Sequence, residues 1–187
     1  MTLADDESGA ATPSGLSHEE ESRRYYPMGA FATQLLGLTT IDGVGQAGLE
    51  SSLNDYLSGK AGSILEEIDG KGREVSYGAR EYVPAVDGGS VTLTIDASIQ
   101  SFAEKAAREA MAVNNAKSVR VLVMQPQTGE ILALVCKPDY DLNDPPRDDV
   151  ETLTQLMRNT VVSDAYEPGS TFKILTAAAA LDAGVTS

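Results

Sequence analysis

The hydrophobic pattern of the first half of the chain predicts short elements. The spacing of apolar residues over 30–38 predicts a short helix, and a second helix is expected over 49–57. Two apolar stretches, 63–68 and 73–77, flank a turn-forming Asp-Gly-Lys-Gly sequence and predict a hairpin. A stretch over 83–89 that contains Pro and three Gly or Asp residues then indicates a linker.

The second half begins with a strand pattern and a long helical pattern. Residues 91–95 alternate between apolar and polar positions, as in a strand. Asp96 is a favourable N-cap for a long helix that ends at Asn114 and Asn115. The apolar face of that helix is predicted to pack in the core and consists of Ile99, Phe102, Ala103, Ala106, Ala107, Ala110 and Met111.

A second hairpin and two more helices are expected after it. The apolar, β-branched stretches 118–125 and 130–137 predict two largely buried strands, and Gly129 suits the left-handed position of the turn between them. A short amphipathic helix is expected over 151–157, and an apolar helix dense in Ala and Leu over 172–181.

These patterns divide the chain into three parts. Residues 1–15 are small, polar and acidic, and we expect a flexible tail because they offer little apolar surface to bury. Residues 16–88 form a first domain and residues 89–187 a second one, with the linker between them as the boundary.

Composition argues against several kinds of site and partner. The net charge of −14 argues against nucleic acid as a partner, and without Trp no platform for stacking bases is evident. The one cysteine, Cys136, excludes an internal disulfide and lies among apolar residues, which predicts a buried thiol. The one histidine, His18, lies in an acidic stretch, so a catalytic His or a His-rich metal site is not expected. No apolar stretch approaches the roughly 20 residues that cross a bilayer, and no signal-peptide pattern opens the chain.

Residues 43–48 match the Gly-x-Gly-x-x-Gly fingerprint of dinucleotide-binding proteins. That motif has meaning when it directly follows a buried strand of a βαβ unit. Here it follows Thr-Thr-Ile-Asp at 39–42, which is too short and polar for such a strand. We therefore do not expect a dinucleotide site.

Ser170 and Lys173 are the candidate catalytic pair. Their spacing puts both side chains on one face of a helix, one turn apart. A Ser hydroxyl needs a base within hydrogen-bond reach, and a Lys amine can serve where burial among apolar neighbours lowers its pKa. The spacing alone is weak, because a Ser that caps a helix before a solvated Lys gives the same pattern. The apolar helix that carries Lys173 favours a Ser-Lys acyl-transfer pair.

The sequence around this pair resembles a known family. Ser-x-x-Lys belongs to the signature of penicillin-binding proteins and class A β-lactamases. The wider run 158–173, which includes Asp-Ala-Tyr-Glu-Pro-Gly-Ser-Thr-Phe-Lys, closely resembles the active-site entry of class B penicillin-binding proteins. The Arg-Tyr-Tyr-Pro sequence at 24–27 and the stretch 48–59 resemble their non-catalytic pedestal, so the resemblance covers nearly all of 15–187.

This resemblance implies an α+β fold. A partial pedestal or dimerisation-type domain at 16–88 would precede the N-terminal part of a penicillin-binding transpeptidase domain at 89–187, an antiparallel sheet flanked by helices. Ser170 would be the acylated nucleophile and Lys173 its base, with no metal or cofactor. The implied ligands are D-Ala-D-Ala ends of peptidoglycan stem peptides and β-lactam antibiotics. Cell-wall or cell-division proteins would bind the pedestal, at the extracytoplasmic face of a bacterial cell membrane.

Two other classes stay open: a β-lactam-hydrolysing or sensing protein, and a non-catalytic interaction module of the cell-wall machinery. The pedestal-like segment argues against the first, because β-lactamases begin directly with the catalytic fold. No Ser-x-Asn or Lys-Thr-Gly follows Ser170 and Lys173. We therefore expect an N-terminal fragment of a membrane-anchored transpeptidase, without its anchor and inactive alone, since half of the oxyanion hole would be absent. Roles in division, elongation and sporulation all fit.

Overall fold

The computed structural model describes residues 23–67 and 80–185. The expected tail at 1–15 and the expected strand at 73–77 lie outside the described residues. Helices and antiparallel strands are mixed, which confirms the α+β class. None of the helices in the described part is long and apolar enough to cross a membrane.

The first part of the chain forms three short helices, α1 (Thr33–Leu36), α2 (Gly48–Ser52) and α3 (Asn54–Leu57). The continuous helix expected over 49–57 is wrong, because Leu53 leaves the helical region with φ −114° and ψ 17°. The side chain of Asn54 accepts a hydrogen bond of 2.8 Å from the backbone N–H of Gly45. This contact ties the start of α3 to the preceding loop, so the helix starts anew at Asn54.

The glycines of the Gly-x-Gly-x-x-Gly stretch allow close approach of backbones. A Cβ on Gly45 would lie 1.9 Å from the carbonyl oxygen of Glu50, and Gly48 has a positive φ and packs on Gly37. The segment before the motif contributes an isolated bridge, Thr39 with Gly45. These glycines therefore serve local packing.

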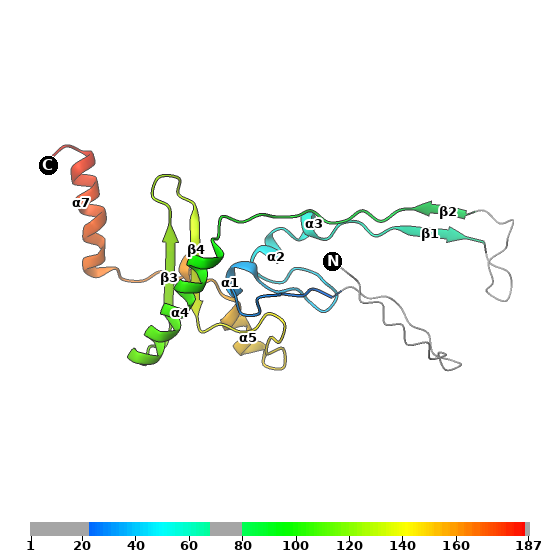
Figure 1. Cartoon of the computed structure of the whole chain (residues 1–187), viewed down its shortest axis with the longest axis horizontal. Coiled ribbons are helices and arrows are strands. Elements are labelled where there is room, and N and C mark those ends of the chain that lie inside the picture. The colour runs from blue at the N-terminus through cyan, green and yellow to red at the C-terminus, as the bar shows by residue number, and fades with distance from the viewer. Residues whose placement is uncertain (1–22, 68–79, 186–187) are drawn as a thin grey trace.

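A two-stranded arm extends from these helices (Figure 1). Strand β1 (Ser63–Glu66) pairs antiparallel with β2 (Arg80–Val83), and a bridge between Lys60 and Val86 continues the pairing toward the body of the molecule. The first strand of the hairpin expected here is confirmed as β1, and the strand that pairs with it is formed by residues 80–83. Part of the expected linker over 83–89 is therefore paired backbone.

The long helix α4 (Ala97–Asn114) starts as expected, because the Asp96 carboxylate accepts 2.9 Å hydrogen bonds from two backbone N–H groups, those of Ser98 and Ile99. The expected apolar face is partly wrong. Ala103 and Ala107 are buried, but Phe102 is 73% exposed. Gln100 takes the central buried position, since it lies on the same face as these two alanines at helical spacing.

Helix α4 covers a hairpin of β3 (Val119–Met124) and β4 (Ile131–Lys137), and Gly129 in the turn has φ +79° as expected. Strand β4 is buried from Ala133 onward, whereas β3 alternates between half-buried and exposed positions, so the expectation of two largely buried strands is wrong for β3. Residues 91–95 do not form the expected strand. They contact β4 through a 2.7 Å hydrogen bond from the Thr94 hydroxyl to the Ile131 carbonyl.

A second core joins the two halves of the chain. It contains Tyr26, Leu38, Tyr140, Leu142 and Leu153. The last of these lies on α5 (Val150–Met157), close to the helix expected over 151–157. Residues 26–38 of the expected first domain therefore share their core with residues 140–157 of the expected second domain.

Candidate active site

The candidate pair lies where a tight turn becomes a helix. After α6 (Thr160–Ser163) the chain runs to Pro168, and Gly169 turns it with φ +54°. The 3-10 helix η1 (Gly169–Phe172) carries Ser170 and continues into α7 (Lys173–Asp182), whose first residue is Lys173. The backbone N–H of Lys173 donates to the Ser170 carbonyl, so the two residues lie one turn apart in a continuous helical run.

The surroundings of the pair differ from the expectation. Ser170 and Lys173 are both exposed, and in residues 23–67 and 80–185 no hydrogen bond joins their side chains. The apolar neighbours on the same helical run are exposed too: Phe172 is 54% exposed, Ile174 74% and Leu175 61%. Figure 1 shows α7 projecting from one end of the molecule, away from α4 and the hairpin. The apolar packing expected around the Lys173 side chain is not formed.

The segment that leads to the pair is anchored to the sheet by charges. The Arg120 guanidinium on β3 donates to the Thr160 hydroxyl at 2.9 Å and to the Asp164 carboxylate at 3.0 Å. Arg158 binds the other oxygen of the same carboxylate at 2.5 Å. Asp164 is thus held between two guanidinium groups at the end of α6, shortly before the turn at Gly169. We call these three residues, Arg120, Arg158 and Asp164, the Asp164 anchor.

Sequence reasoning missed the role of Arg120, because nothing in the order of residues links β3 to the segment 158–164. The burial of Cys136 was predicted correctly: the residue is 4% exposed on β4. Its thiol lies 3.6 Å from the side-chain oxygen of Asn159, so β4 also contacts the segment before the candidate pair. The central hairpin therefore holds this segment in two ways, by the ion pair of Arg120 with Asp164 and by the hydrogen bond of Cys136 to Asn159.

Two family models match this chain. Residues 119–187, which contain Ser170 and Lys173, match the penicillin binding protein transpeptidase domain. Residues 6–93 match the penicillin-binding protein dimerisation domain. This chain belongs to the class B penicillin-binding proteins. The two models in this order agree with the pedestal and transpeptidase parts that the resemblance implied.

Individual penicillin-binding proteins are similar over most of the chain. The stage V sporulation protein D of Bacillus subtilis is 38% identical over 90% of this chain, which covers 26% of that protein. The probable peptidoglycan D,D-transpeptidase PenA of Neisseria meningitidis is 41% identical over 90% of this chain and 28% of its own length. The chain thus spans about a quarter of the length of these relatives.

A solved structure supports the same assignment. Penicillin binding protein 3 from Mycobacterium tuberculosis, in complex with aztreonam, superposes with a TM-score of 0.69 at 31% identity. The match covers 88% of this chain and 32% of that structure. The arrangement of arm, helices and hairpin is therefore that of a penicillin-binding protein.

Proposed function

We propose that the protein of which these residues are part is a serine D,D-transpeptidase that cross-links peptidoglycan stem peptides, with Ser170 as nucleophile and Lys173 as base. The observation that carries the proposal is the position of both residues on one helical turn inside the segment that matches the transpeptidase domain. The relative named as a D,D-transpeptidase, at 41% identity, supports the reaction class.

The chemistry follows from the two side chains. The neutral Lys173 amine takes the proton from the Ser170 hydroxyl as its oxygen attacks the carbonyl between the two terminal D-Ala residues. The C–N bond breaks, and the departing D-Ala amine takes the proton from the Lys173 ammonium. An amine from a second stem peptide then attacks the ester on Ser170. A new amide forms and Ser170 leaves with a proton, which restores the starting state.

A β-lactam would enter the same path at its first step. Ser170 attacks the strained ring amide and the C–N bond of the ring breaks. The released amine stays covalently attached to the acyl group, so no leaving group departs to make room for the second amine. The aztreonam complex of the Mycobacterium tuberculosis protein supports β-lactams as ligands of this site. Neither acylation nor acyl transfer, as proposed, needs a metal ion or a cofactor.

The domain division and location are part of the proposal. Residues 16–88 act as a pedestal that binds cell-wall or cell-division proteins, and residues 89–187 supply the start of the catalytic domain. A reaction on stem peptides places the protein at the extracytoplasmic face of the bacterial membrane. The match to the dimerisation domain over 6–93 supports this division and disfavours a free β-lactam hydrolase.

Catalysis by Ser170 and Lys173 requires these side chains to be covered more completely than they are among the described residues. Lys173 and its apolar neighbours on α7 are exposed, whereas a catalytic site that excludes water needs these surfaces to be covered. We infer that the 187-residue chain alone is acylated slowly, and that covering the exposed residues Phe172, Ile174 and Leu175 is the step that activates the pair.

Labelling with a fluorescent penicillin tests the proposal in the protein as its cells produce it. We expect a stable adduct on Ser170, identified by mass spectrometry. Ser170→Ala should abolish the adduct, and Lys173→Ala should slow its formation by several orders of magnitude, because nucleophile and base act as a unit. Ser101→Ala, an exposed serine on α4, is the matched control. Rapid release of hydrolysed penicillin would favour a hydrolase, and no adduct at all would favour a non-catalytic module.

A further inference from the structure

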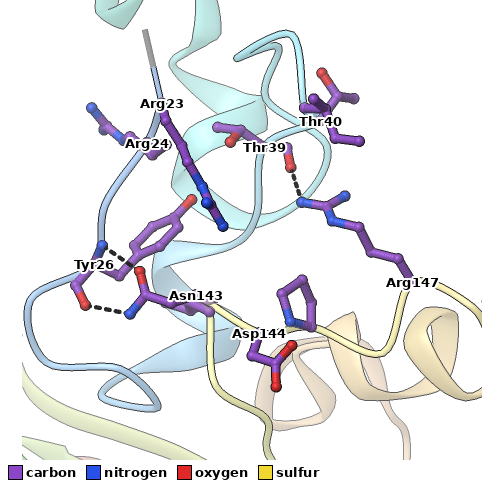
Figure 2. Close-up of a pocket in the computed structure, with 11 residues that line it drawn as sticks. Arg23, Arg24, Tyr26, Thr39, Thr40, Asn143, Asp144 and Arg147 are labelled. Atoms are coloured by element: carbon purple, nitrogen blue, oxygen red, sulfur yellow. Dashed lines mark hydrogen bonds between the residues drawn. The ribbon is translucent and has the colours of Figure 1, made fainter. Parts of the chain in front are cut away.

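A second candidate site lies away from Ser170, where the N-terminal segment meets the loop before α5. It is a cavity of about 450 Å³. Its polar lining comes from three stretches of chain and includes Arg23, Tyr26, Thr39, Asn143, Asp144 and Arg147 (Figure 2). None of its lining residues belongs to η1 or α7, so the cavity is separate from the proposed active site.

Tyr26 lines this cavity, but its hydroxyl is buried and out of reach of a ligand there. The residue is 8% exposed, and its hydroxyl has no hydrogen-bond partner in the part of the chain that the structure describes. The backbone N–H and carbonyl of Tyr26 are both bound by the side chain of Asn143, at 2.9 and 2.7 Å. The Asn143 side chain thus joins the segment of Tyr26 to the loop before α5, so the two stretches that carry Arg23 and Arg147 are held together.

Two arginines add positive charge on the same side. Figure 2 shows the side chains of Arg23 and Arg147 reaching toward the space beside Thr39 from different segments, while the Asp144 carboxylate turns away. Arg147 donates one hydrogen bond of 2.8 Å to the Thr39 carbonyl, which fixes its guanidinium and leaves further N–H groups open. Among the described residues Arg23 and Arg147 form no ion pair.

The neighbouring Arg24 differs, because the Glu50 carboxylate neutralises it at 2.7 Å. Among the described residues, the positive charge of the cavity that no carboxylate neutralises therefore comes from Arg23 and Arg147, in a chain with a net charge of −14. Such a local reversal of sign attracts anions despite the acidic surface around it.

Two guanidinium groups reach the cavity from separate directions. A planar carboxylate is satisfied by a single guanidinium fork, whereas a tetrahedral oxyanion presents oxygens to several donors at once. We propose that this cavity binds the phosphate group of a small molecule or lipid headgroup. A volume of about 450 Å³ exceeds one phosphate and leaves room for the group that carries it.

Titration with inorganic phosphate and with diphosphate at constant ionic strength tests the proposal in the 187-residue chain. Because the chain has no Trp, tyrosine fluorescence, to which Tyr26 and six other tyrosines contribute, follows binding without Trp interference, and calorimetry gives the dissociation constant. We expect saturable binding that Arg147→Gln weakens about tenfold to a hundredfold. Arg23→Gln should weaken it severalfold with the fold intact, as checked by circular dichroism. Arg108→Gln, an exposed arginine on α4, should leave the affinity unchanged.

Vesicles separate the two sources of phosphate. Co-sedimentation with phosphatidic acid vesicles, but not with phosphatidylcholine vesicles, that is lost in Arg147→Gln would assign a lipid headgroup. Binding of diphosphate without co-sedimentation would assign a soluble phosphate ligand. No saturable binding of either probe, or equal binding by Arg147→Gln, Arg23→Gln and Arg108→Gln, would overturn the proposal and leave an adventitious ion only.

Discussion

Gln100 lies between α4 and β4 with its side chain fully buried. Its amide nitrogen donates to the Leu134 carbonyl at 2.9 Å and to the Glu104 carboxylate at 2.8 Å, and its amide oxygen accepts from the Leu134 N–H at 2.8 Å. Glu104 in turn accepts from the backbone N–H of Ala32. One polar side chain thus satisfies the buried backbone of β4 and connects α4 to the segment before α1.

Gln100→Ala should therefore destabilise the chain by about 2–4 kcal/mol, since it leaves both backbone groups of Leu134 unpaired and creates a small cavity. Chemical denaturation followed by circular dichroism measures the loss. Gln127→Ala, at an exposed position in the turn between β3 and β4, is the control and should change the free energy of unfolding by less than about 0.5 kcal/mol. Equal effects of the two substitutions would refute the bridging role of Gln100.

Tyr140 gives the protein a dependence on alkaline pH. Burial, with a further contribution from nearby Tyr26, raises the pKa of Tyr140 from the usual 10.0 to about 12. The stabilisation is complete below pH 10. Between pH 10 and 12 the unfolded chain loses the proton while the folded chain keeps it, so stability falls as the pH rises.

Tyr140→Phe should flatten this decline, although Tyr26, whose pKa burial also raises, retains part of it. At pH 7 the substitution should be neutral or slightly stabilising, because the Tyr140 hydroxyl is buried without a partner in the described part of the chain. Urea denaturation at pH 7, 10 and 11.5 measures both effects. Tyr166→Phe, at a 71% exposed position, should keep the wild-type pH profile.

At the scale of elements, the Asp164 anchor determines where the segment before Ser170 is attached. The Asp164 side chain is 22% exposed and receives guanidinium groups from β3 and from Arg158. Pairs of this partial exposure contribute modestly to stability, but two hydrogen bonds to one carboxylate fix its position. The turn at Gly169 therefore begins from a defined point on the sheet, although α7 beyond it is uncovered.

A double-mutant cycle of Arg120→Ala and Asp164→Ala should give a coupling free energy of about 1 kcal/mol, reduced at high salt. Hydrogen exchange should show faster exchange of α6 amides in both single variants, and penicillin labelling of Ser170 should slow without loss of the hairpin. Asp148→Ala, an exposed acid in the loop before α5, is the matched control. A coupling energy near zero would mean that the anchor does not hold the segment.

The elements that the sequence predicted correctly are those with complete local signals. The Asp96 cap with the helical period fixes α4, and two β-branched stretches around a Gly turn fix the hairpin of β3 and β4. Expectations that depended on distant partners were less successful. Phe102 fits the apolar stripe of α4 but finds no surface to cover it, and residues 91–95 alternate correctly but contact β4 without becoming a strand. The candidate pair was located on one helical turn, whereas its environment depends on surfaces that local patterns do not encode.

At the scale of the whole molecule, two cores are linked through α1 and its flanks. One core lies between α4 and the hairpin around Ala107 and Ala133, and the other joins Tyr26 and Leu38 to the residues after β4. The Gln34 amide on α1 donates to two carbonyls that flank the second core, at 3.2 and 3.1 Å, and the backbone N–H of Ala32 donates to Glu104 on α4, beside the first core, at 2.8 Å. The pedestal part and the transpeptidase part therefore share a boundary that is packed and hydrogen-bonded.

This sharing predicts that the two parts unfold together. Leu38 is 1% exposed in the second core, so Leu38→Ala should cost about 2–5 kcal/mol. Because that core includes residues on both sides of the expected domain boundary, the loss should appear as a single unfolding transition at lower denaturant. Native-state hydrogen exchange should show equal loss of protection in α1 and in the β4 amides of Ala133 to Cys136.

The exposed Leu65, at 70% on β1, provides the control, because Leu65→Ala removes a side chain of the same size from the arm. It should change the free energy of unfolding by less than about 0.5 kcal/mol and leave the exchange of β4 amides unaltered. Loss of protection in Leu38→Ala that stops at α1, with β4 amides exchanging as in the wild type, would show that the two parts unfold independently. In that case the hydrogen bonds of Gln34 and Glu104 across the boundary would be too weak to couple them.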